Sequence, residues 1–353
     1  MAADFQSELQ AKKELVDKAL NDYLASIDVS TYSAHGQQAW AMLQDFSSRP
    51  GKRFRGSMLL VSYEMCGGDN HEEAMKAAVA MELVQNYLLI VDDVMDRSEI
   101  RRTKPTLQYM YLDEIEEEAG EDAKHLSDML AVNVGLLASH VAGQLMNELD
   151  LPADRVVAAN QKFHENIKQT TYGQVDDLYS GVGHTSVEDI MMTHELKSSY
   201  YTFINPMQVG AILAGADEKQ IETIHRFGVP AGIAFQLQDD ILGLSGNDKE
   251  TGKAYLDDLK EGKRTLLMQN ALDMANKDGA IKLVEALGNP NVSEEMAAEV
   301  RDIVTECGAR KKADAEARSQ ADTARAVIAD LEWPGEGASF LDGLLDYVVE
   351  RLN

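Results

Sequence analysis

Two aspartates four residues apart, Asp92 and Asp96, follow an apolar run from Tyr87 to Val91. On a helix this spacing places both carboxylates on one face, about one turn apart. Carboxylates beside apolar side chains are costly unless something neutralises them, and Mg²⁺ favours one or two carboxylates together with phosphate oxygens. The pair therefore predicts metal-assisted chemistry on a phosphorylated substrate. The alternative is a helix that simply emerges into solvent at Val91.

Basic residues stand on both sides of this acidic pair. Arg101, Arg102 and Lys104 follow it, and residues 51–55 (Gly-Lys-Arg-Phe-Arg) place three cations just after a Pro-Gly turn, at a predicted helix start. Arginine forks suit phosphate oxygens, and the backbone N–H groups of a helix start add to anion binding. Each basic group alone could form surface salt bridges. Together with the acidic pair, they indicate a diphosphate site.

A second acidic cluster lies on another predicted helix. Gln236, Asp239, Asp240 and Gly243 fall on neighbouring faces of it by three- and four-residue spacing. A glycine-bearing loop follows with further charged residues, namely Lys253, Asp257, Asp258, Lys263 and Arg264. Two such clusters on separate helices suggest a cavity with metals and phosphates at its rim. That arrangement is needed to remove a diphosphate leaving group, because its developing charge must be neutralised.

With these motifs the sequence resembles the trans-isoprenyl diphosphate synthases of the polyprenyl synthetase family, of the geranylgeranyl or farnesyl diphosphate synthase type. The similarity runs from about Gly51 to Leu267. The family's two aspartate-rich motifs correspond to residues 92–96 and 239–243, and its GQxxD segment to residues 173–177. The resemblance implies three Mg²⁺ ions, and it implies metal ligands with supporting carboxylates, namely Asp92, Asp96 and Asp239 with Asp93, Asp177 and Asp240.

The resemblance also implies two substrate sites. Isopentenyl diphosphate would be bound by Lys52, Arg55, Gln85 and Arg102. The allylic diphosphate would be bound by Arg101, Lys197, Lys253 and Lys263. The expected reaction is ionisation of the allylic diphosphate, condensation and proton loss, in a dry pocket that protects the carbocation from water. The residues expected to carry it are Lys197, Ser198 and Gln236, with Asp92 and Asp239.

The depth of the pocket should set the length of the product. On an ideal helix Met81, Gln85 and Leu88 lie within about 40° of the direction of Asp92, so they should line a cavity at increasing depth. The resemblance places chain-length control at Tyr87 and Leu88, although both could be ordinary core residues. One aromatic residue there, with no insertion in the first motif, resembles enzymes that stop at C20. Geranylgeranyl diphosphate is therefore the predicted main product and farnesyl diphosphate the second.

The sequence departs from the family at two positions. Gly243 stands where many members carry the last aspartate of the second motif, and Ser198 replaces a common threonine but keeps the hydroxyl. The chief metal contact of the second motif is implied at Asp239, so activity is still expected. The sequence offers no dedicated base for the final proton, which the departing diphosphate would remove.

Helical periodicity recurs through most of the chain, with only seven prolines and no convincing alternating runs. It predicts an all-α, single-domain bundle over residues 1–353 with a central cavity. The motifs would lie in a core at about 51–267. The predicted helices are 4–27, 34–48, 54–66, 71–96, 104–117, 124–149, 154–180, 186–200, 201–215, 217–244, 264–286, 294–330 and 338–352.

Composition and net charge limit the classes of partner that the protein is expected to bind. The 353 residues are 44% hydrophobic and 26% charged, which is typical of a folded globular protein. A net charge of −27 repels nucleic acids and anionic membranes, and it reflects either an ordinary solvated surface or a high-salt habitat. The uncharged run 129–147 is predicted to be a buried core helix rather than a membrane span. Two cysteines and no visible N-terminal signal predict a cytoplasmic protein without disulfides.

Two other functions remain open at this point. A class I terpene cyclase also uses a DDxxD motif and Mg²⁺, but it needs no isopentenyl diphosphate site such as residues 51–55 indicate. A non-catalytic regulatory subunit of a prenyl synthase should have lost the acidic motifs, and both are present here. The resemblance further implies a homodimer.

Overall fold

The computed structural model describes residues 2–181, 185–244, 257–329, 333 and 337–350. Its first part places the first acidic motif at a helix end. Asn70 caps the helix that carries this motif by accepting a hydrogen bond from the N–H of Glu73, and the helix ends with Asp96 as its C-cap residue. The helices of this part are α1 (Ala2–Ser26), α2 (Ala34–Ser48), α3 (Phe54–Met65) and α4 (His71–Met95).

A short antiparallel hairpin follows α4. It pairs β1 (Ile100–Arg101) with β2 (Lys104–Pro105), with Ile100 opposite Pro105 and Arg101 opposite Lys104. The chain then continues through α5 (Leu107–Ala119), a 3₁₀ turn at Gly120–Asp122, α6 (Ala123–Asn147) and α7 (Ala153–Ser180).

The second acidic motif lies at the end of α10. It is preceded by a π-helical segment, which is rare in proteins and often marks a functional site. These elements are α8 (Val187–Thr193), the π-helix η2 (His194–Ile204), α9 (Asn205–Ala214) and α10 (Glu218–Gly243). The C-terminal part contains α12 (Asp257–Glu261), α13 (Leu266–Met274), α14 (Lys277–Ala286), α15 (Glu294–Glu306), α16 (Ala309–Ala329) and α17 (Ala338–Glu350).

The all-α prediction is confirmed, with five local corrections. Residues 257–261 of the predicted glycine-bearing loop form the short helix α12. The predicted helix 264–286 is two helices, because the side chain of Asn276 caps a new one at 2.8 Å from the N–H of Gly279. The predicted helix 294–330 breaks at Gly308, whose φ is +86°. The predicted boundary at 200/201 is absent, because η2 continues directly into α9. The hairpin at 100–105 was not predicted, since strands of two residues have no detectable alternation.

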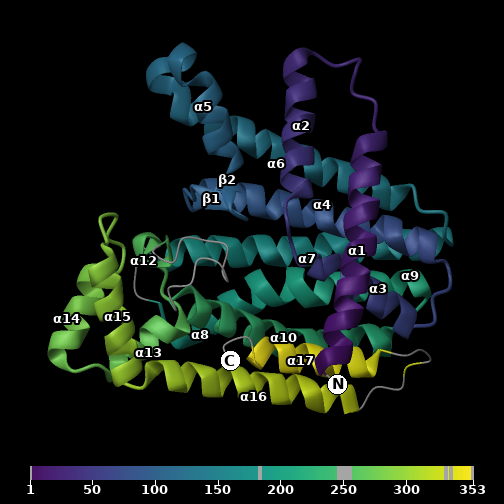
Figure 1. The fold of residues 1–353 in the computed structure, drawn as a ribbon. Helices are drawn as coiled ribbons and strands as arrows, with labels where there is room; N and C mark the ends of the chain where they lie inside the picture. Colours follow the sequence, from purple (N-terminus) through teal and green to yellow (C-terminus); the bar gives the residue numbers. More distant parts are fainter. Residues whose placement is uncertain (1, 182–184, 245–256, 330–332, 334–336, 351–353) are drawn as a thin grey trace.

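The long helices α4, α6, α7, α10 and α16 lie across the molecule in successive layers, and α1 crosses several of them (Figure 1). The C-terminal ends of α4 and α7, the β hairpin and α12 lie on the same side. Helix α4 is the centre of the largest core cluster, with Ala77, Ala78 and Leu83 fully buried. This arrangement brings the acidic end of α4 together with the end of α7.

Two segments, α4 and Leu107–Asn147, are long and apolar enough to cross a membrane by length and composition alone. Core helices of soluble proteins pass the same test, so this is weak evidence for a span. In α4, 67% of the most apolar window is buried inside the fold, and in Leu107–Asn147 the share is 44%. The burial of α4 is that of a core helix.

Helices α3 and α9 approach so closely that only glycine fits at one position. A Cβ at Gly210 would lie 2.3 Å from the carbonyl oxygen of Leu59. Gly210→Ala should therefore push the helices apart and lower the free energy of unfolding by about 1–3 kcal/mol, as other overpacked cores do. Gly143→Ala on α6 is the control, because its Cβ would meet nothing within 4 Å. Urea unfolding followed by circular dichroism compares the two, and equal stabilities would contradict the prediction.

Candidate active site

The last turn of α4 carries three carboxylates, and the hairpin folds back over them. Asp93 is buried, and Arg101 on β1 donates to it from Nε at 2.7 Å. The same guanidinium lies 3.6 Å from Asp92. Burial opposes the charge of Arg101, but the attraction of Asp93 and Asp92 outweighs it and raises its pKa. The hairpin therefore places a permanent cation beside the first motif.

Two lysines from distant elements complete the first cluster. Lys197 of η2 places its Nζ 2.6 Å from Asp177 and 3.3 Å from Asp92. Lys263 places its Nζ 2.8 Å from Asp96 and 3.6 Å from Asp177. Each lysine thus bridges carboxylates of α4 and α7. The predicted residues Asp92, Asp96, Asp177, Lys197 and Lys263 are brought together here.

The charges in this cluster stabilise one another. Burial disfavours both lysine cations, but the carboxylates around them outweigh it and raise the pKa of Lys197 and of Lys263. Burial likewise disfavours the Asp177 carboxylate, yet Lys197 and Lys263 lower its pKa below the usual value. Lys197, Lys263 and Asp177 therefore keep their charges at neutral pH, with the two cations held between carboxylates of α4 and α7.

The cluster opens onto a cavity of about 450 Å³, which is the size of a small-molecule site. Its lining combines the end of α4, the hairpin, the end of α7 and the segment around α12, namely Met95, Asp96, Arg97, Glu99, Ile100, Asp177, Leu178, Gly181, Lys260, Glu261, Lys263 and Pro290.

The second acidic cluster is connected to the first through η2. Ser198, the neighbour of Lys197, donates to Oε1 of Gln236 at 2.5 Å. Gln236 in turn donates to Asp240 at 2.8 Å, and His194 lies 3.4 Å from the other oxygen of Asp240. Asp239 is half-buried on α10 beside them. Consecutive residues of one π-helix therefore bond to both acidic clusters.

Glycines on both flanking helices allow η2 to come this close. A Cβ at Gly173 of α7 would lie 2.3 Å from the backbone nitrogen of Lys197, and one at Gly232 of α10 would lie 2.3 Å from Ser199. Gly173 is the glycine of the GQxxD segment. The tight contact between α7, η2 and α10 thus fixes where Lys197 and Ser198 stand.

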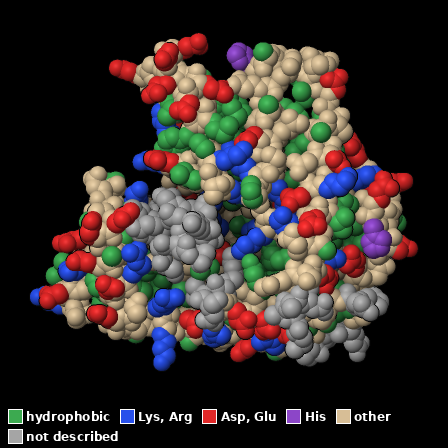
Figure 2. Space-filling view, viewed as in Figure 1, with side chains coloured by type: hydrophobic (Ala, Val, Ile, Leu, Met, Phe, Trp, Pro, Cys, Tyr) green, Lys and Arg blue, Asp and Glu red, His purple; other side chains and the backbone are tan. Residues whose placement is uncertain are grey.

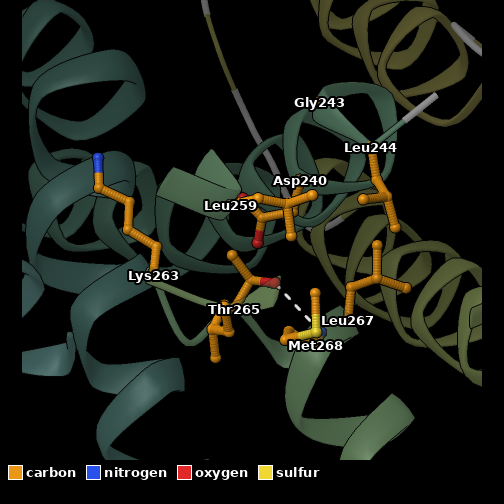
Figure 3. Close-up of a pocket in the computed structure, with 9 residues that line it drawn as sticks. Asp240, Gly243, Leu244, Leu259, Lys263, Thr265, Leu267 and Met268 are labelled. Carbon is orange, nitrogen blue, oxygen red and sulfur yellow. Dashed lines mark hydrogen bonds between the residues drawn. The ribbon is translucent and has the colours of Figure 1, made fainter. Parts of the chain in front are cut away.

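A small cavity of about 20 Å³ lies beside Asp240 (Figure 3), and it is large enough for about one water molecule. Asp240 and Thr265 face it, while the side chain of Lys263 extends away from both. Thr265 accepts a hydrogen bond from the N–H of Met268 at 3.2 Å, which caps α13. Gly243, the departure from the family motif, lines this cavity.

Two of the predicted isopentenyl diphosphate residues, Arg55 and Arg102, form a second basic group, in which the two like charges act on each other. Arg55 at the start of α3 donates to Thr202 at 2.9 Å and stacks on Tyr201, both in η2. Arg102 lies against Gly51, where a Cβ would be 3.2 Å from its guanidinium. Burial and the nearby charge of Arg53 lower the pKa of Arg102 to about 10. Lys52 is exposed, with its Nζ over the ring of Tyr347.

Three of these residues have buried polar atoms without a hydrogen-bond partner in the part of the chain that the structure describes. They are Nε of Arg55, Oε1 of Gln85 and Nη1 of Arg102. Unsatisfied buried polar groups are costly, and they are expected where a ligand supplies the missing bond. Two arginine donors of this kind fit an anionic ligand.

The remaining predicted residues are not part of these contacts. Met81 is buried on α4, and Tyr87 and Leu88 are half-buried beside the largest core cluster. Lys253 lies outside the described residues.

Several residues that support the site were not predicted from the sequence, among them Arg49 and His194. Arg49 is buried, donates to Asp45 at 2.9 Å and reaches the carbonyl oxygen of Arg101 at 3.4 Å, so it holds the hairpin in place. His194 is buried against Asp240. For His194, its position one turn before Lys197 on a helix was a usable signal. Arg49 gave none, because its contact with the hairpin spans 52 residues.

Within the described residues, no three His, Cys, Asp or Glu side chains already converge as a metal cage. Mg²⁺ does not need one, since it is commonly held by one or two carboxylates, substrate phosphates and water. Asp92 and Asp96 can supply the two carboxylates. Asp96 lines the 450 Å³ cavity, and Asp92 lies one helical turn before it on α4. The residues present therefore fit Mg²⁺ bound together with a diphosphate.

The comparisons with known proteins agree with this geometry. The model of the polyprenyl synthetase family matches residues 37–304. A geranylfarnesyl diphosphate synthase of Aeropyrum pernix is 32% identical over 86% of this chain and 91% of that protein. A (2E,6E)-farnesyl diphosphate synthase of Mycobacterium tuberculosis is 30% identical over 85% of this chain and 80% of that protein.

The similarity extends to solved structures. A geranylgeranyl pyrophosphate synthase from Corynebacterium glutamicum, complexed with isoprenyl diphosphate and magnesium, superposes with a TM-score of 0.91 at 27% identity. The match covers 97% of this chain and 99% of that one. Fold and sequence thus define one class, and this chain belongs to the polyprenyl synthetase family. Within that family it is a prenyltransferase of the short-chain isoprenyl diphosphate synthase type.

The bridging role of Lys263 can be tested without substrate. Lys263→Met should leave Asp96, Asp177 and Glu261 without their shared cation. Breaking a fully buried ion pair costs about 3–5 kcal/mol. Lys263 is 17% exposed, so the metal-free protein should lose somewhat less, about 2 kcal/mol of unfolding free energy or more. Lys282→Met is the control, since its pair with Glu299 is half-exposed and should matter little. Urea unfolding in EDTA gives both values, and equal losses would contradict the prediction.

Proposed function

We propose that this protein is a Mg²⁺-dependent prenyltransferase that condenses isopentenyl diphosphate head-to-tail with dimethylallyl, geranyl or farnesyl diphosphate. Its main product is geranylgeranyl diphosphate, with farnesyl diphosphate second. The observation that carries the proposal is the pair of buried, unsatisfied arginine donors on Arg55 and Arg102. A terpene cyclase needs only the acidic clusters, whereas a condensing enzyme needs this second anion site.

The two basic groups have different tasks in this reaction. Isopentenyl diphosphate is bound by Arg55 and Arg102 with Lys52 and Gln85, which fixes its double bond close to the allylic carbon. The allylic diphosphate is bound by Arg101, Lys197 and Lys263, and Lys253 is proposed to join them. Because Lys197 and Lys263 already carry raised pKa values, they stay cationic when the diphosphate arrives.

The carboxylates hold the metal. Asp92, Asp96 and Asp239 are the proposed ligands of three Mg²⁺ ions, and Asp93, Asp177 and Asp240 orient the groups around them. Bound Mg²⁺ would neutralise the diphosphate leaving group. Asp93 suits an orienting role because it is buried and held by Arg101. Asp240 suits one because it accepts the hydrogen bond of Gln236.

The carbocation needs polar groups that stabilise it without attacking it. Ser198 and Gln236 offer a hydroxyl and an amide dipole, and the hydrogen bond between them at 2.5 Å fixes both orientations. The backbone carbonyl at Lys197 lies in the same π-helix. Departing diphosphate is the proposed acceptor of the final proton.

The acidic ligands can be tested directly. Asp92→Ala and Asp239→Ala should each lower kcat at least about 100-fold, because each removes charge neutralisation at the leaving group. Helical content should stay at the wild-type level. Asp113→Ala, at an exposed position of α5, is the control and should keep full activity. Products are measured with isopentenyl diphosphate and each allylic diphosphate. Near-normal turnover in either variant would defeat the assignment, and a hydrocarbon formed without isopentenyl diphosphate would indicate a cyclase.

The similar proteins include farnesyl, geranylgeranyl and geranylfarnesyl diphosphate synthases, so membership of the family does not set the length of the product. Tyr87 and Leu88 are half-buried one turn or more before Asp92, and Met81 lies deeper on the same helix. We assign chain-length control to these three residues.

Substitutions at these positions should change product length in opposite directions. Tyr87→Ala should shift products to longer chains, because it removes a ring from the wall of the pocket. Leu88→Phe should shift them to shorter chains, because it adds volume. Chromatography of the dephosphorylated products measures both, and Leu15→Ala on the exposed side of α1 is a neutral control. An unchanged distribution in both variants would exclude this wall as the limit.

The exposed faces of α6 and α7 support a homodimer. Helix α6 exposes Leu126, Met129 and Leu136 at three- to seven-residue spacing. Helix α7 exposes further large apolar side chains, namely Val157, Tyr172, Val175, Leu178 and Tyr179. Several large apolar side chains exposed on two neighbouring helices are what a subunit interface would cover. We propose a homodimer through these faces, in the cytoplasm.

A further inference from the structure

The helices around the proposed site contact one another at two depths, which we call the upper and the lower level. Near the acidic motifs, α4, α7 and η2 meet through Asp92, Asp177 and Lys197. At the lower level, the contacts are made by Met81 of α4, Asn166 of α7 and Asn205 at the start of α9. Asn205 places its amide nitrogen 3.8 Å from the sulfur of Met81, and Asn166 donates to Asn205 at 3.4 Å.

The distance between the two levels follows from helix geometry. Eleven residues separate Asp92 from Met81, and eleven separate Asp177 from Asn166. At about 1.5 Å per residue, the two levels are about 16 Å apart. An extended isoprene unit has four bonds along the chain and advances roughly 5 Å, by comparison with 3.8 Å for the three bonds between successive Cα atoms. The interval therefore matches about three isoprene units.

The lower level is polar although it is buried. Asn166 donates to Gln208 at 3.0 Å, and Gln208 donates to the carbonyl oxygen of Ile221 at 3.1 Å. Asn166, Asn205 and Gln208 are all less than 5% exposed. Buried amides are costly unless they bond to one another, and here they do. Apolar side chains would fill the same volume with a smaller desolvation cost, so the buried amides are expected to serve a function.

We infer that Asn166, Asn205 and Gln208 form a polar floor that ends elongation of the prenyl chain. The inference rests on the proposed function. A hydrocarbon that grows past Met81 must displace hydrogen-bonded amides and cannot replace their bonds. A farnesyl chain of three units reaches the floor from the acidic motifs and can still accept one more unit. A geranylgeranyl chain would have to enter the amide cluster, so it is released.

This floor acts differently from Tyr87 and Leu88. Those residues limit the chain by volume close to the metals, whereas the amides lie about two turns deeper and limit it by polarity. Space and polarity can be separated with two substitutions at one position. Asn205→Ala removes the amide and opens space, and Asn205→Ser opens nearly the same space but keeps a hydrogen-bonding group.

The test compares the products of these two variants with farnesyl diphosphate and isopentenyl diphosphate as substrates. Asn205→Ala should raise the share of products longer than those of the wild type about tenfold, the effect of one lost hydrogen bond. Asn205→Ser should raise it less than about twofold. Asn160→Ala is the control, because Asn160 also lies on α7 but bonds to the carbonyl oxygens of Met146 and Val156.

Three outcomes decide the matter. Equal lengthening by alanine and serine would show that volume alone sets the floor and would overturn the inference. Unchanged products in Asn205→Ala would also overturn it. Absence of any condensation by the wild type would instead refute the proposed function. Asn166→Ala and Asn166→Ser repeat the comparison from a different helix, so the inference stays testable if the Asn205 variants do not fold.

Discussion

Repulsion between carboxylates is the constraint on which the rest of this structure depends. The ends of α4 and α7 carry Asp92, Asp96 and Asp177 into one place, where the three side chains are mostly buried and solvent screens their charges poorly. Lys197 and Lys263 make that convergence possible by bridging the two helices. Lys197 lies on the π-helix η2, which packs tightly between α7 and α10. Glycine is needed at 173 and 232 because a Cβ at either position would overlap η2. The geometry of the whole site follows from this requirement.

Backbone strain is concentrated in the same region. Among the described non-glycine residues, positive φ angles occur at Arg53, Arg97, Arg102 and Thr103, all next to the acidic motif or the basic group. Such conformations cost about 1–3 kcal/mol each and persist where surrounding contacts enforce them. Arg53 is enforced by its ion pair with Asp17 at 2.5 Å. The hairpin that carries Arg102 is held by Arg49 from below.

The acidity of the protein and its need for anionic substrates are reconciled by position. Acidic side chains gather at the end of α5 on the surface (Figure 2), where water and salt screen them within about 8 Å. The cations that matter are buried, and burial with like-charged neighbours leaves the Arg102 cation poorly compensated, as its pKa near 10 reflects. An anion bound there relieves that penalty, so the site can attract a diphosphate despite the net charge of −27.

Local pattern alone determined much of this protein. The helices 34–48, 54–66 and 71–96 were predicted to within one residue, because their periodicity and caps are local, and the motifs at 92–96 and 239–243 were visible by spacing. Tertiary structure alone decided which charges meet. Lys263 bonds to Asp96 across 167 residues, Arg49 reaches the hairpin across 52, and the amide cluster joins α7 to α9 across about 40. Sequence spacing encodes neighbours along one helix, whereas contacts between helices depend on how closely their backbones pack, and that is set by the whole core.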